Sequence, residues 1–372
     1  MADVAGARPK DRKRASALVA RTLEERWRGT RITTVGDVAG DASARRYLRF
    51  GLAEADERPL AGAAPRSLVV MLCEGSGAAL SSDELAVFGD EGPKELPFVN
   101  VWRFLSPLTD AVPEIFAVSE DQSVLVLEDV GDVSLWQAAN EPGADPEALF
   151  GRALDLLADL QTRAVDDGSG CYAFGQAFDE RLFDWEFEHF IEHGLARSDA
   201  CALAACRAEL HAVAVRLDRM PKVFAHRDYH AWNLHVQTRG REARIRVLDF
   251  QDALLAPAMY DVASLLTDRS TPELIDTALA HRLVERFAAR IPRERLGAED
   301  TREAFELCAL QRVLKVVGRF NYLAAVKGKP RYLDMLPAVV ATARRLASGR
   351  AGLEATAALL ANDVKGGPSC AR

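Results

Sequence analysis

The sequence predicts an α/β chain of the α+β kind, with a β-rich N-terminal lobe and a mainly helical C-terminal lobe. With 372 residues the chain is too long for one ordinary hydrophobic core, so two compact parts are expected. Before Gly131, short apolar segments alternate with turn residues, which is typical of strands. After Gly131, the apolar residues recur at helical spacing. We therefore place the N-lobe at residues 1–130 and the C-lobe at residues 131–364, joined by a hinge near 128–132.

The first part of the N-lobe is expected to hold a helix and two strands. Residues 15–29 show a helical pattern that ends at Gly29, and the basic run at 8–14 before it indicates a solvated tail. Residues 31–50 indicate two strands, because Gly, Asp and Ser gather in a turn between the apolar halves. The other elements expected in this lobe are strands at 67–72, 112–118 and 123–129 and a helix at 97–108.

The C-lobe is expected to be helical apart from one β segment. In residues 146–164 one helical face is expected to carry Leu149, Ala153, Leu156, Leu157 and Leu160. Residues 223–226 indicate a strand, and residues 234–250 indicate a hairpin. The other helices expected here cover 178–194, 199–219 and 306–325, with most of 259–347 helical. Residues 365–372, which carry Gly, Pro and Ser, are expected to form a disordered tail.

Composition and charge argue against several classes of protein. The chain has 47 Lys and Arg against 55 Asp and Glu, which argues against nucleic acid as a partner. No apolar run approaches ~18 residues, so no membrane-spanning helix is predicted, and no signal peptide is evident. The six cysteines are scattered and lack the spacing of metal ligands. We expect a cytoplasmic protein with reduced thiols, and we infer no obligatory protein partner.

A cluster of polar residues, HRDYHAWN at 226–233, lies between the apolar segments PKVFA and LHV. Leaving even a neutral polar group buried without a partner costs ~1–3 kcal/mol, and an unpaired charge costs more. The cluster is therefore either a satisfied structural network or the lining of a cleft that performs chemistry. In the structural alternative, Asp228 and Asn233 cap a turn and Asp249 ends a strand, as Asp and Asn often do.

The spacing of the cluster favours phosphoryl transfer. HRDYHAWN is followed, one hairpin later, by DFQD at 249–252. A kinase needs one carboxylate that accepts the proton of the attacking hydroxyl, and an amide and a second carboxylate that hold Mg²⁺ against the nucleotide phosphates. Protein kinases carry H-R-D-L-x-x-x-N followed by D-F-G, with the same order of roles. The first three residues of the cluster and Asn233 match that pattern, as do Asp249 and Phe250, but Gln251 stands in place of Gly.

The segments HRDYHAWNLHV and VLDFQDALLAPAMYDVASLL resemble the catalytic segments of the aminoglycoside phosphotransferase/choline kinase-like family. Within that family, four further segments resemble the bacterial kinases of the anomeric hydroxyl of N-acetylmuramate and N-acetylglucosamine. These segments are GDASARRYLRF (40–50), VLEDVGD (126–132), LQRVLKVVGRFNYL (310–323) and GKPRYLDMLPAVV (328–340). The resemblance implies a protein-kinase-like fold of two lobes, with ATP and Mg²⁺ as cofactors.

The resemblance also implies a role for each residue of the catalytic segments. Asp228 is expected to be the catalytic base, and Asn233 and Asp249 are expected to be the Mg²⁺ ligands. His226 is expected to brace the loop through hydrogen bonds. Asp261 is expected to support the loop structurally, since an Asp that opens a helix is most often a cap.

The N-lobe residues expected to bind the nucleotide come from a turn and from the end of the last strand. The turn at 36–43, which includes Ser43, is a candidate to cover the phosphates with backbone N–H groups, although any hairpin turn has this composition. Glu128 and Val130, just before the hinge, are expected to present backbone groups to adenine.

The cation that opposes the phosphates has no obvious source. Protein kinases use a Lys on the third strand, and Met71 occupies about that position here. Phosphate charges beside carboxylates need a cation to offset them. Arg45 or Arg46 on the second strand is therefore the expected substitute.

The residues that contact the acceptor are the hardest to predict from the sequence, and each of them has an alternative, structural role. Trp232 either stacks on a sugar or packs inside the protein. His230 hydrogen-bonds either the substrate or the loop, and Asp252 either approaches metal and substrate or is an ordinary loop residue. Trp185 and Lys315 either line the acceptor pocket or lie on solvated helix faces.

The resemblance thus implies an ATP-dependent kinase that phosphorylates the anomeric hydroxyl of N-acetylmuramate and/or N-acetylglucosamine, for cell-wall sugar recycling. One alternative is an aminoglycoside or choline-type kinase, whose cationic acceptor needs a pocket rich in Asp and Glu. The other is a catalytically silent nucleotide-binding module, an alternative that the departures at Met71 and Gln251 keep open. The presence of Asp228, Asn233 and Asp249 together argues against the silent module.

Overall fold

The computed structural model describes residues 7–38, 45–53, 64–73, 95–196, 199–239, 242–298 and 300–365. The chain divides into two compact units. The first, the N-terminal unit, comprises Met1–Ser106 and Asp110–Gly131, and the second, the C-terminal unit, comprises Pro107–Thr109 and Asp132–Arg372. The tail expected at 365–372 lies outside the described residues, apart from Lys365.

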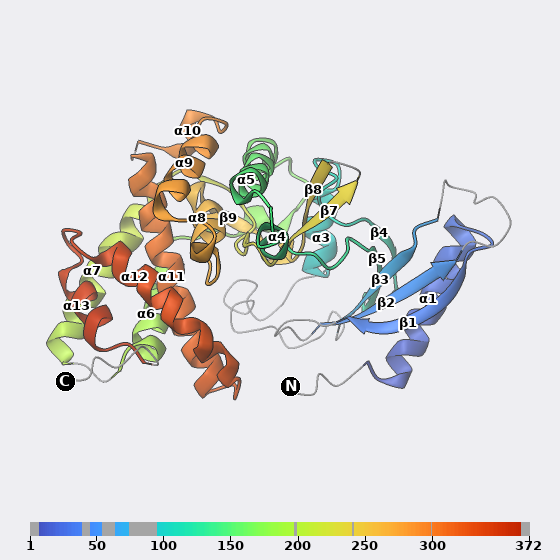
Figure 1. The fold of residues 1–372 in the computed structure, drawn as a ribbon, viewed down its shortest axis with the longest axis horizontal. Coiled ribbons are helices and arrows are strands. Elements are labelled where there is room, and N and C mark those ends of the chain that lie inside the picture. The colour runs from blue at the N-terminus through green and yellow to red at the C-terminus, as the bar shows by residue number, and fades with distance from the viewer. Residues whose placement is uncertain are drawn as a thin grey trace. The chain divides into compact units, whose positions relative to one another are not determined.

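A five-stranded antiparallel sheet forms the N-terminal unit, with the strand order β1-β2-β3-β5-β4 (Figure 1). Its strands are β1 (Arg31–Val38), β2 (Arg46–Ala53), β3 (Ser67–Leu72), β4 (Ile115–Val118) and β5 (Val124–Glu128), and helix α3 (Pro97–Leu105) precedes β4. The register pairs Tyr47 with Met71 and Met71 with Leu125. Because directly paired residues point to the same side, these three side chains share one face of the sheet.

Helix α1 (Pro9–Arg26) packs on the other face of this sheet. Its buried Ala15 and Val19 join Leu48 and Phe50 of β2 in one hydrophobic core. Leu48 and Phe50 alternate along β2 with Tyr47, so the strand presents its apolar side to the helix.

The basic run at 8–14 forms the beginning of α1, so the prediction of a solvated tail was wrong. The helix begins at Pro9 rather than at residue 15, because proline suits the first helical position, where no N–H partner is needed. Arg12 pairs with Asp37 of β1, and Arg14 pairs with Asp121 before β5. The run therefore ties the helix to acidic groups of the same unit.

The C-terminal unit is built around the long helix α11 (Thr301–Ala325), which is in contact with α6, α8 and α12 (Figure 1). Asp300 caps α11, accepting hydrogen bonds from the backbone N–H groups of Arg302 and Glu303. The other helices are α4 (Leu135–Ala139), α5 (Pro146–Arg163), α6 (Glu180–Gly194), α7 (Ala200–Asp218), α8 (Met259–Thr267), α9 (Thr277–Ala288), α10 (Arg293–Leu296), α12 (Leu336–Ala347) and α13 (Glu354–Asn362). The 3₁₀ turns are Tyr172–Gly175, Phe250–Asp252, Thr271–Glu273 and Pro330–Met335.

Two small antiparallel ladders bring the predicted catalytic segments of the C-terminal unit together. Strand β6 (Lys222–Ala225) pairs with β9 (Leu254–Pro257), and β7 (Leu234–Arg239) pairs with β8 (Glu242–Val247). The polar cluster at 226–233 connects β6 to β7, and DFQD at 249–252 connects β8 to β9. Both connections therefore run between the same two ladders, and the N–H of Leu248 donates to the carbonyl of Asn233, so the two predicted catalytic segments lie next to each other.

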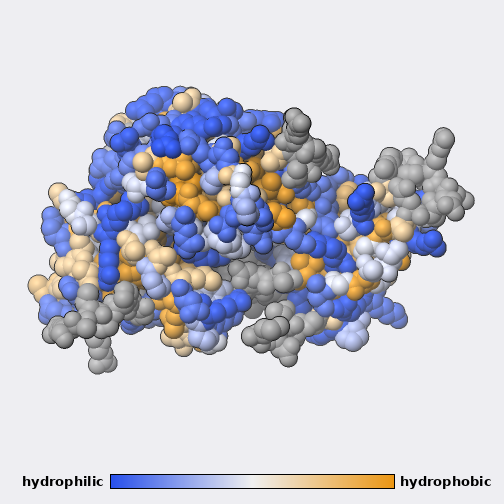
Figure 2. Space-filling model, in the orientation of Figure 1, coloured by the Kyte–Doolittle hydropathy of each residue, from blue (hydrophilic) through white to orange (hydrophobic). Residues whose placement is uncertain are grey.

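Hydrophilic residues cover most of the face shown in Figure 2, and hydrophobic residues occur there in separate patches. Within the described residues, none of the helices combines the length and the apolar character needed to cross a membrane.

Candidate active site

The loop at 226–233, here the catalytic loop, is held at its start by a buried carboxylate from α8. The backbone N–H groups of His226 and Arg227 donate to the two oxygens of Asp261 at 2.7 and 3.0 Å. Burial raises the pKa of Asp261 to about 7, while these backbone hydrogen bonds oppose the shift. Arg227 has a φ of 75°, a left-handed conformation that a non-glycine residue keeps only where its surroundings hold it. These contacts support the structural role expected for Asp261.

His226 links the catalytic loop to the segment that carries Asp249. Its Nε2 lies 2.8 Å from the carbonyl oxygen of Leu248. Burial lowers the pKa of His226, against the pull of the nearby Asp249 and Asp228 carboxylates, so the ring is neutral at pH 7. A neutral ring that meets a carbonyl must place its proton on Nε2, which then donates. His226 is thus a brace between the two segments.

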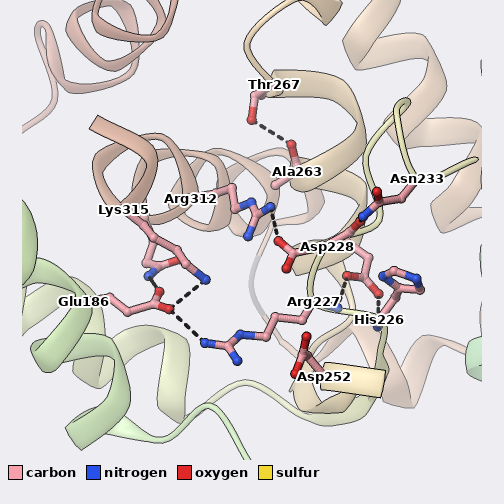
Figure 3. A network of polar contacts seen from close by, with 12 residues as sticks. Glu186, His226, Arg227, Asp228, Asn233, Asp252, Ala263, Thr267, Arg312 and Lys315 are labelled. Atoms are coloured by element: carbon pink, nitrogen blue, oxygen red, sulfur yellow. Dashed lines mark hydrogen bonds and ion pairs between the residues drawn. The ribbon is translucent and has the colours of Figure 1, made fainter. Parts of the chain in front are cut away.

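Asp228 meets a guanidinium from a distant part of the chain. Nη2 of Arg312, in α11 and 84 residues later, donates to Oδ1 of Asp228 at 2.6 Å (Figure 3). The Arg312 side chain is 7% exposed, whereas the Asp228 side chain is 35% exposed. Desolvation raises the pKa of Asp228, but the charges of Arg312 and Lys315 outweigh it and hold that pKa well below its usual range. Asp228 is therefore an ionised carboxylate with an open side.

Asn233 and Asp249 are tied to the catalytic loop through the backbone. Nδ2 of Asn233 donates to the main-chain carbonyl of Asp228 at 3.0 Å, and the N–H of Leu248 donates to the Asn233 carbonyl at 2.9 Å. The amide oxygen of Asn233 accepts no hydrogen bond from any described residue. Asp249 follows Leu248 directly and has a left-handed φ of 63°. The two predicted metal ligands therefore belong to segments that are hydrogen-bonded to each other.

Gln251, the departure from the D-F-G pattern, is buried and holds two carboxylates. Its Nε2 donates to Oδ1 of Asp249 at 2.9 Å and to Oδ2 of Asp252 at 2.8 Å. Asn233, Asp249 and Asp252 offer hard oxygen donors, which are the ligands that Mg²⁺ prefers. The donor set therefore fits Mg²⁺.

A buried network of charges lies behind Asp228. Glu186 of α6 is 1% exposed, and its Oε1 lies 2.8 Å from Nζ of Lys315 and 3.6 Å from Nη2 of Arg227 (Figure 3). Nε2 of Gln311 donates to its other oxygen at 2.5 Å. Gly318 allows α11 to pack this closely against α6, because a Cβ at position 318 would lie only 2.8 Å from the Cα of Phe190 in α6. Burial lowers the pKa of Lys315, and Glu186 opposes that shift.

The residues expected at the acceptor are spread over this region. Trp232 is stacked on Trp136 with 4.8 Å between the ring centroids, and its Nε1 donates to Ser270, which favours the packing alternative. The His230 backbone N–H donates to the Asp228 carbonyl, and its buried Nδ1 has no hydrogen-bond partner among the described residues. Trp185 is 41% exposed and is stacked on His189.

The N-terminal residues expected at the nucleotide differ in their surroundings. Ser43 lies outside the described residues. Nη2 of Arg46 donates to Asp11 of α1 at 2.9 Å, and Arg46 shares the α1 side of the sheet with Leu48. Arg45 precedes β2, and it lies close enough to Cys73, just after β3, for its charge to act on that thiol.

Glu128 and Val130 end the N-terminal unit in an ordered segment. The backbone N–H of Glu128 donates to the carbonyl of Glu114 at 2.9 Å, and Val130 is buried. Between them, Asp129 accepts two hydrogen bonds from Arg49, at 2.7 and 3.0 Å.

Sequence reasoning missed Arg312 and the joint role of Glu186 and Gln311. Each lies on a helix far along the chain from the catalytic loop. The available signal was a pair of cations, at 312 and 315, three residues apart within a largely apolar stretch of a helix. Such a pair is costly to bury without carboxylates opposite it.

The fold and the sequence have known relatives. The chain is 32% identical over 310 residues to the N-acetylmuramate/N-acetylglucosamine kinase of Pseudomonas aeruginosa, covering 80% of this chain and 79% of that protein. It is 28% identical over 315 residues to the protein of the same name from Caulobacter vibrioides, covering 81% and 84%. An ADP-bound aminoglycoside phosphotransferase shares the fold, with a TM-score of 0.54 at 12% identity over 89% of this chain and 98% of that one. Residues 38–302 match the sequence profile of the Phosphotransferase enzyme family.

That match spans more than half of the chain and contains both the catalytic loop and Asp249. The protein-kinase-like fold expected from the motif is confirmed by the shared architecture of the aminoglycoside phosphotransferases. The chain belongs to the Phosphotransferase enzyme family and is a phosphotransferase.

Proposed function

We propose that the chain is a cytoplasmic, ATP- and Mg²⁺-dependent kinase that phosphorylates the anomeric hydroxyl of N-acetylmuramate and/or N-acetylglucosamine. The names of the relatives at about 30% identity support the choice of acceptor. The observation that carries the proposal is the state of Asp228, whose carboxylate is ionised, one-third exposed and held at one oxygen only.

The free oxygen of Asp228 suits the role of general base. Oδ1 accepts from Arg312, and none of the described residues donates to Oδ2. In the proposed reaction, Oδ2 accepts the proton of the acceptor hydroxyl while the hydroxyl oxygen bonds to the γ-phosphorus. The bond from that phosphorus to the bridging oxygen of ADP breaks, so the products are ADP and the sugar 1-phosphate.

Asn233 and Asp249 are proposed to hold the metal. Because Nδ2 of Asn233 is engaged by the Asp228 carbonyl, its amide oxygen is the atom presented to a cation. Gln251 keeps Asp249 and Asp252 together, which places two negative groups on the same side. When bound, Mg²⁺ neutralises charge on the nucleotide phosphates. The chain supplies the ligands and their orientation.

For the nucleotide, we keep the sequence-based predictions for the turn with Ser43, for Arg45 as the phosphate cation, and for the backbone of Glu128 and Val130 at adenine. Arg46 is the weaker candidate because Asp11 already engages its guanidinium.

Three cations lie around the base, namely the buried Arg227 and Arg312 and the partly exposed Lys315, and each of them faces a carboxylate, Glu186 or Asp228. For the acceptor we keep His230, Asp252, Lys315 and the exposed Trp185 as candidates. An indole face of this kind suits stacking on a sugar ring.

The experiment is a panel of acceptors with Mg-ATP, followed by phosphorus NMR. The panel contains both amino sugars, glucose, choline and an aminoglycoside. The proposal expects transfer to one or both amino sugars, with the product phosphate coupled to the anomeric proton. Phosphorylation of choline or the aminoglycoside alone, or of a sugar hydroxyl other than the anomeric one, would refute it.

A further inference from the structure

The Arg312–Asp228 ion pair gives the catalytic carboxylate a fixed orientation. We propose that Arg312 is a positioning residue of the transfer reaction, which holds Oδ1 of Asp228 so that Oδ2 faces the acceptor hydroxyl. This inference rests on the base role proposed above for Asp228. The catalytic-loop pattern contains no group with this task, since Arg312 comes from α11.

The surroundings of Arg312 leave its guanidinium few alternatives. The side chain is almost fully buried, and the guanidinium carbon lies 5.9 Å from the ring centroid of the fully buried Tyr260. The 2.6 Å distance to Asp228 is that of a charge-assisted hydrogen bond. Because both the cation and the ring beneath it are packed, Asp228 is tied to a rigid part of the unit rather than to a mobile surface arginine.

The backbone of Asp228 is already fixed, so the orientation of its side chain is the freedom that remains. Asp261 holds the N–H groups of the two preceding residues, and the Asp228 carbonyl accepts from the N–H of His230 and from Nδ2 of Asn233. None of these bonds restrains rotation about the side-chain torsions. The bond to Arg312 does, and it leaves the second oxygen on the exposed side.

A simpler role for Arg312 is to neutralise a half-buried carboxylate for the sake of stability. The two roles differ in their consequences. A structural arginine affects turnover through the amount of folded enzyme, whatever residue stands at 228. A positioning arginine affects kcat only while Asp228 is present to be positioned.

The test compares Arg312→Met and Arg312→Lys with a matched control on the same helix. Arg302 donates to Glu285 at 2.7 Å in an exposed ion pair, so Arg302→Met makes the same chemical change away from the site. We expect Arg312→Met to lower kcat by ~10²-fold, the order of loss that a misplaced catalytic group causes, with little change in KM for ATP. Arg312→Lys should recover about tenfold of that loss, and Arg302→Met should leave kcat unchanged.

The decisive measurement repeats Arg312→Met in an Asp228→Asn background. Positioning through Asp228 predicts that the second substitution lowers the residual kcat by less than about threefold, because the effects of coupled residues are not additive. The proposal would be overturned if Arg312→Met lowered kcat by the same ~10²-fold factor in both backgrounds, or if it left the kcat of the otherwise wild-type enzyme unchanged. If circular dichroism shows Arg312→Met to be unfolded, Arg312→Lys replaces it in both backgrounds.

The test of Arg312 does not depend on which acceptor the enzyme phosphorylates. The kinetics are measured with whichever acceptor the wild-type enzyme phosphorylates, or with water as the acceptor if only ATP hydrolysis is found. Failure of the amino sugars therefore refutes the choice of substrate, whereas additivity of the two substitutions refutes the role of Arg312.

Discussion

Replacing Glu186 by Gln tests whether the buried charge network behind the catalytic loop holds the C-terminal unit together. The substitution keeps the volume and shape of the side chain. It removes the negative charge that faces Lys315 at 2.8 Å and Arg227 at 3.6 Å, and it turns one acceptor oxygen into a donor. Gln311, which donates to Glu186 at 2.5 Å, then risks meeting another donor.

The magnitude follows from the burial of the partners. Removing one member of a buried ion pair costs about 3–5 kcal/mol, because the other charge stays buried without compensation. Lys315 keeps 18% of its side chain exposed, so water relieves part of its loss, and we expect a value near the lower end, about 3 kcal/mol. The same change at Glu188, two residues along α6, supplies the control. Glu188 and Arg207 form an ion pair with 52% and 48% of their side chains exposed, and such pairs contribute about 0.2–1 kcal/mol.

Urea unfolding followed by tryptophan fluorescence measures both variants, since Trp136, Trp185 and Trp232 report on the C-terminal unit. The free energy of unfolding should fall by about 3 kcal/mol for Glu186→Gln and by less than about 1 kcal/mol for Glu188→Gln. Adding Lys315→Met to Glu186→Gln should restore part of the loss, because it removes one uncompensated cation. Equal small losses for the two glutamines would refute the reasoning that burial sets the strength of this network.

Other consequences concern the chemistry of the site. Asp228→Asn should lower turnover by ~10²–10⁴-fold with ATP affinity by calorimetry nearly unchanged; full turnover would remove Asp228 as the base. Gln251→Ala should raise the Mg²⁺ concentration needed for half-maximal turnover, because two carboxylates lose their common donor; an unchanged requirement would contradict that link. The pKa of Asp228 is lowered, so its carboxylate stays ionised above about pH 4 and the pair with Arg312 weakens only as the pH falls through the lowered pKa. A profile of kcat/KM with an uncharged sugar should therefore show no acid limb due to Asp228 between about pH 5 and 8. Brief alkylation at about pH 8 should modify the exposed Cys201 long before Cys308, because burial raises the pKa of the Cys308 thiol; equal labelling would argue against the packing around Cys308.

The parts of this protein that sequence reasoning could predict are those encoded locally. The spacing of Asp228 and Asn233, and the hairpin that leads to Asp249, indicated phosphoryl transfer because the proposed base and the proposed metal ligands lie within one short stretch. Strands bounded by turns and the helical periodicity after Gly131 indicated the architecture in the same way. The short strand β9 (Leu254–Pro257) was missed, since only its pairing with β6 defines it.

The parts that could not be predicted depend on contacts between distant segments. Arg312 meets Asp228 across 84 residues, and Glu186 meets Gln311 across 125. The basic run at the start of α1 was misjudged for the same reason, because its carboxylate partners lie on other elements. Composition shows that charges are present, but only the packed structure shows which of them are opposite one another.

Gln251, which stands in place of the D-F-G glycine, changes how the segment is held but leaves the carboxylate of Asp249 in place. In this chain the left-handed conformation falls on Asp249 itself, with a φ of 63°, so no glycine is required at 251 for the turn. Gln251 can then use its side chain, and its amide nitrogen joins Asp249 to Asp252. A carboxylate with an unfavourable backbone conformation needs such restraint to keep one geometry. The same logic applies to Asp228, which follows the left-handed Arg227 and is restrained by Arg312. Each of these two carboxylates thus lies at or next to a left-handed residue and has a side-chain partner that fixes it, so the site is ordered before any substrate is bound.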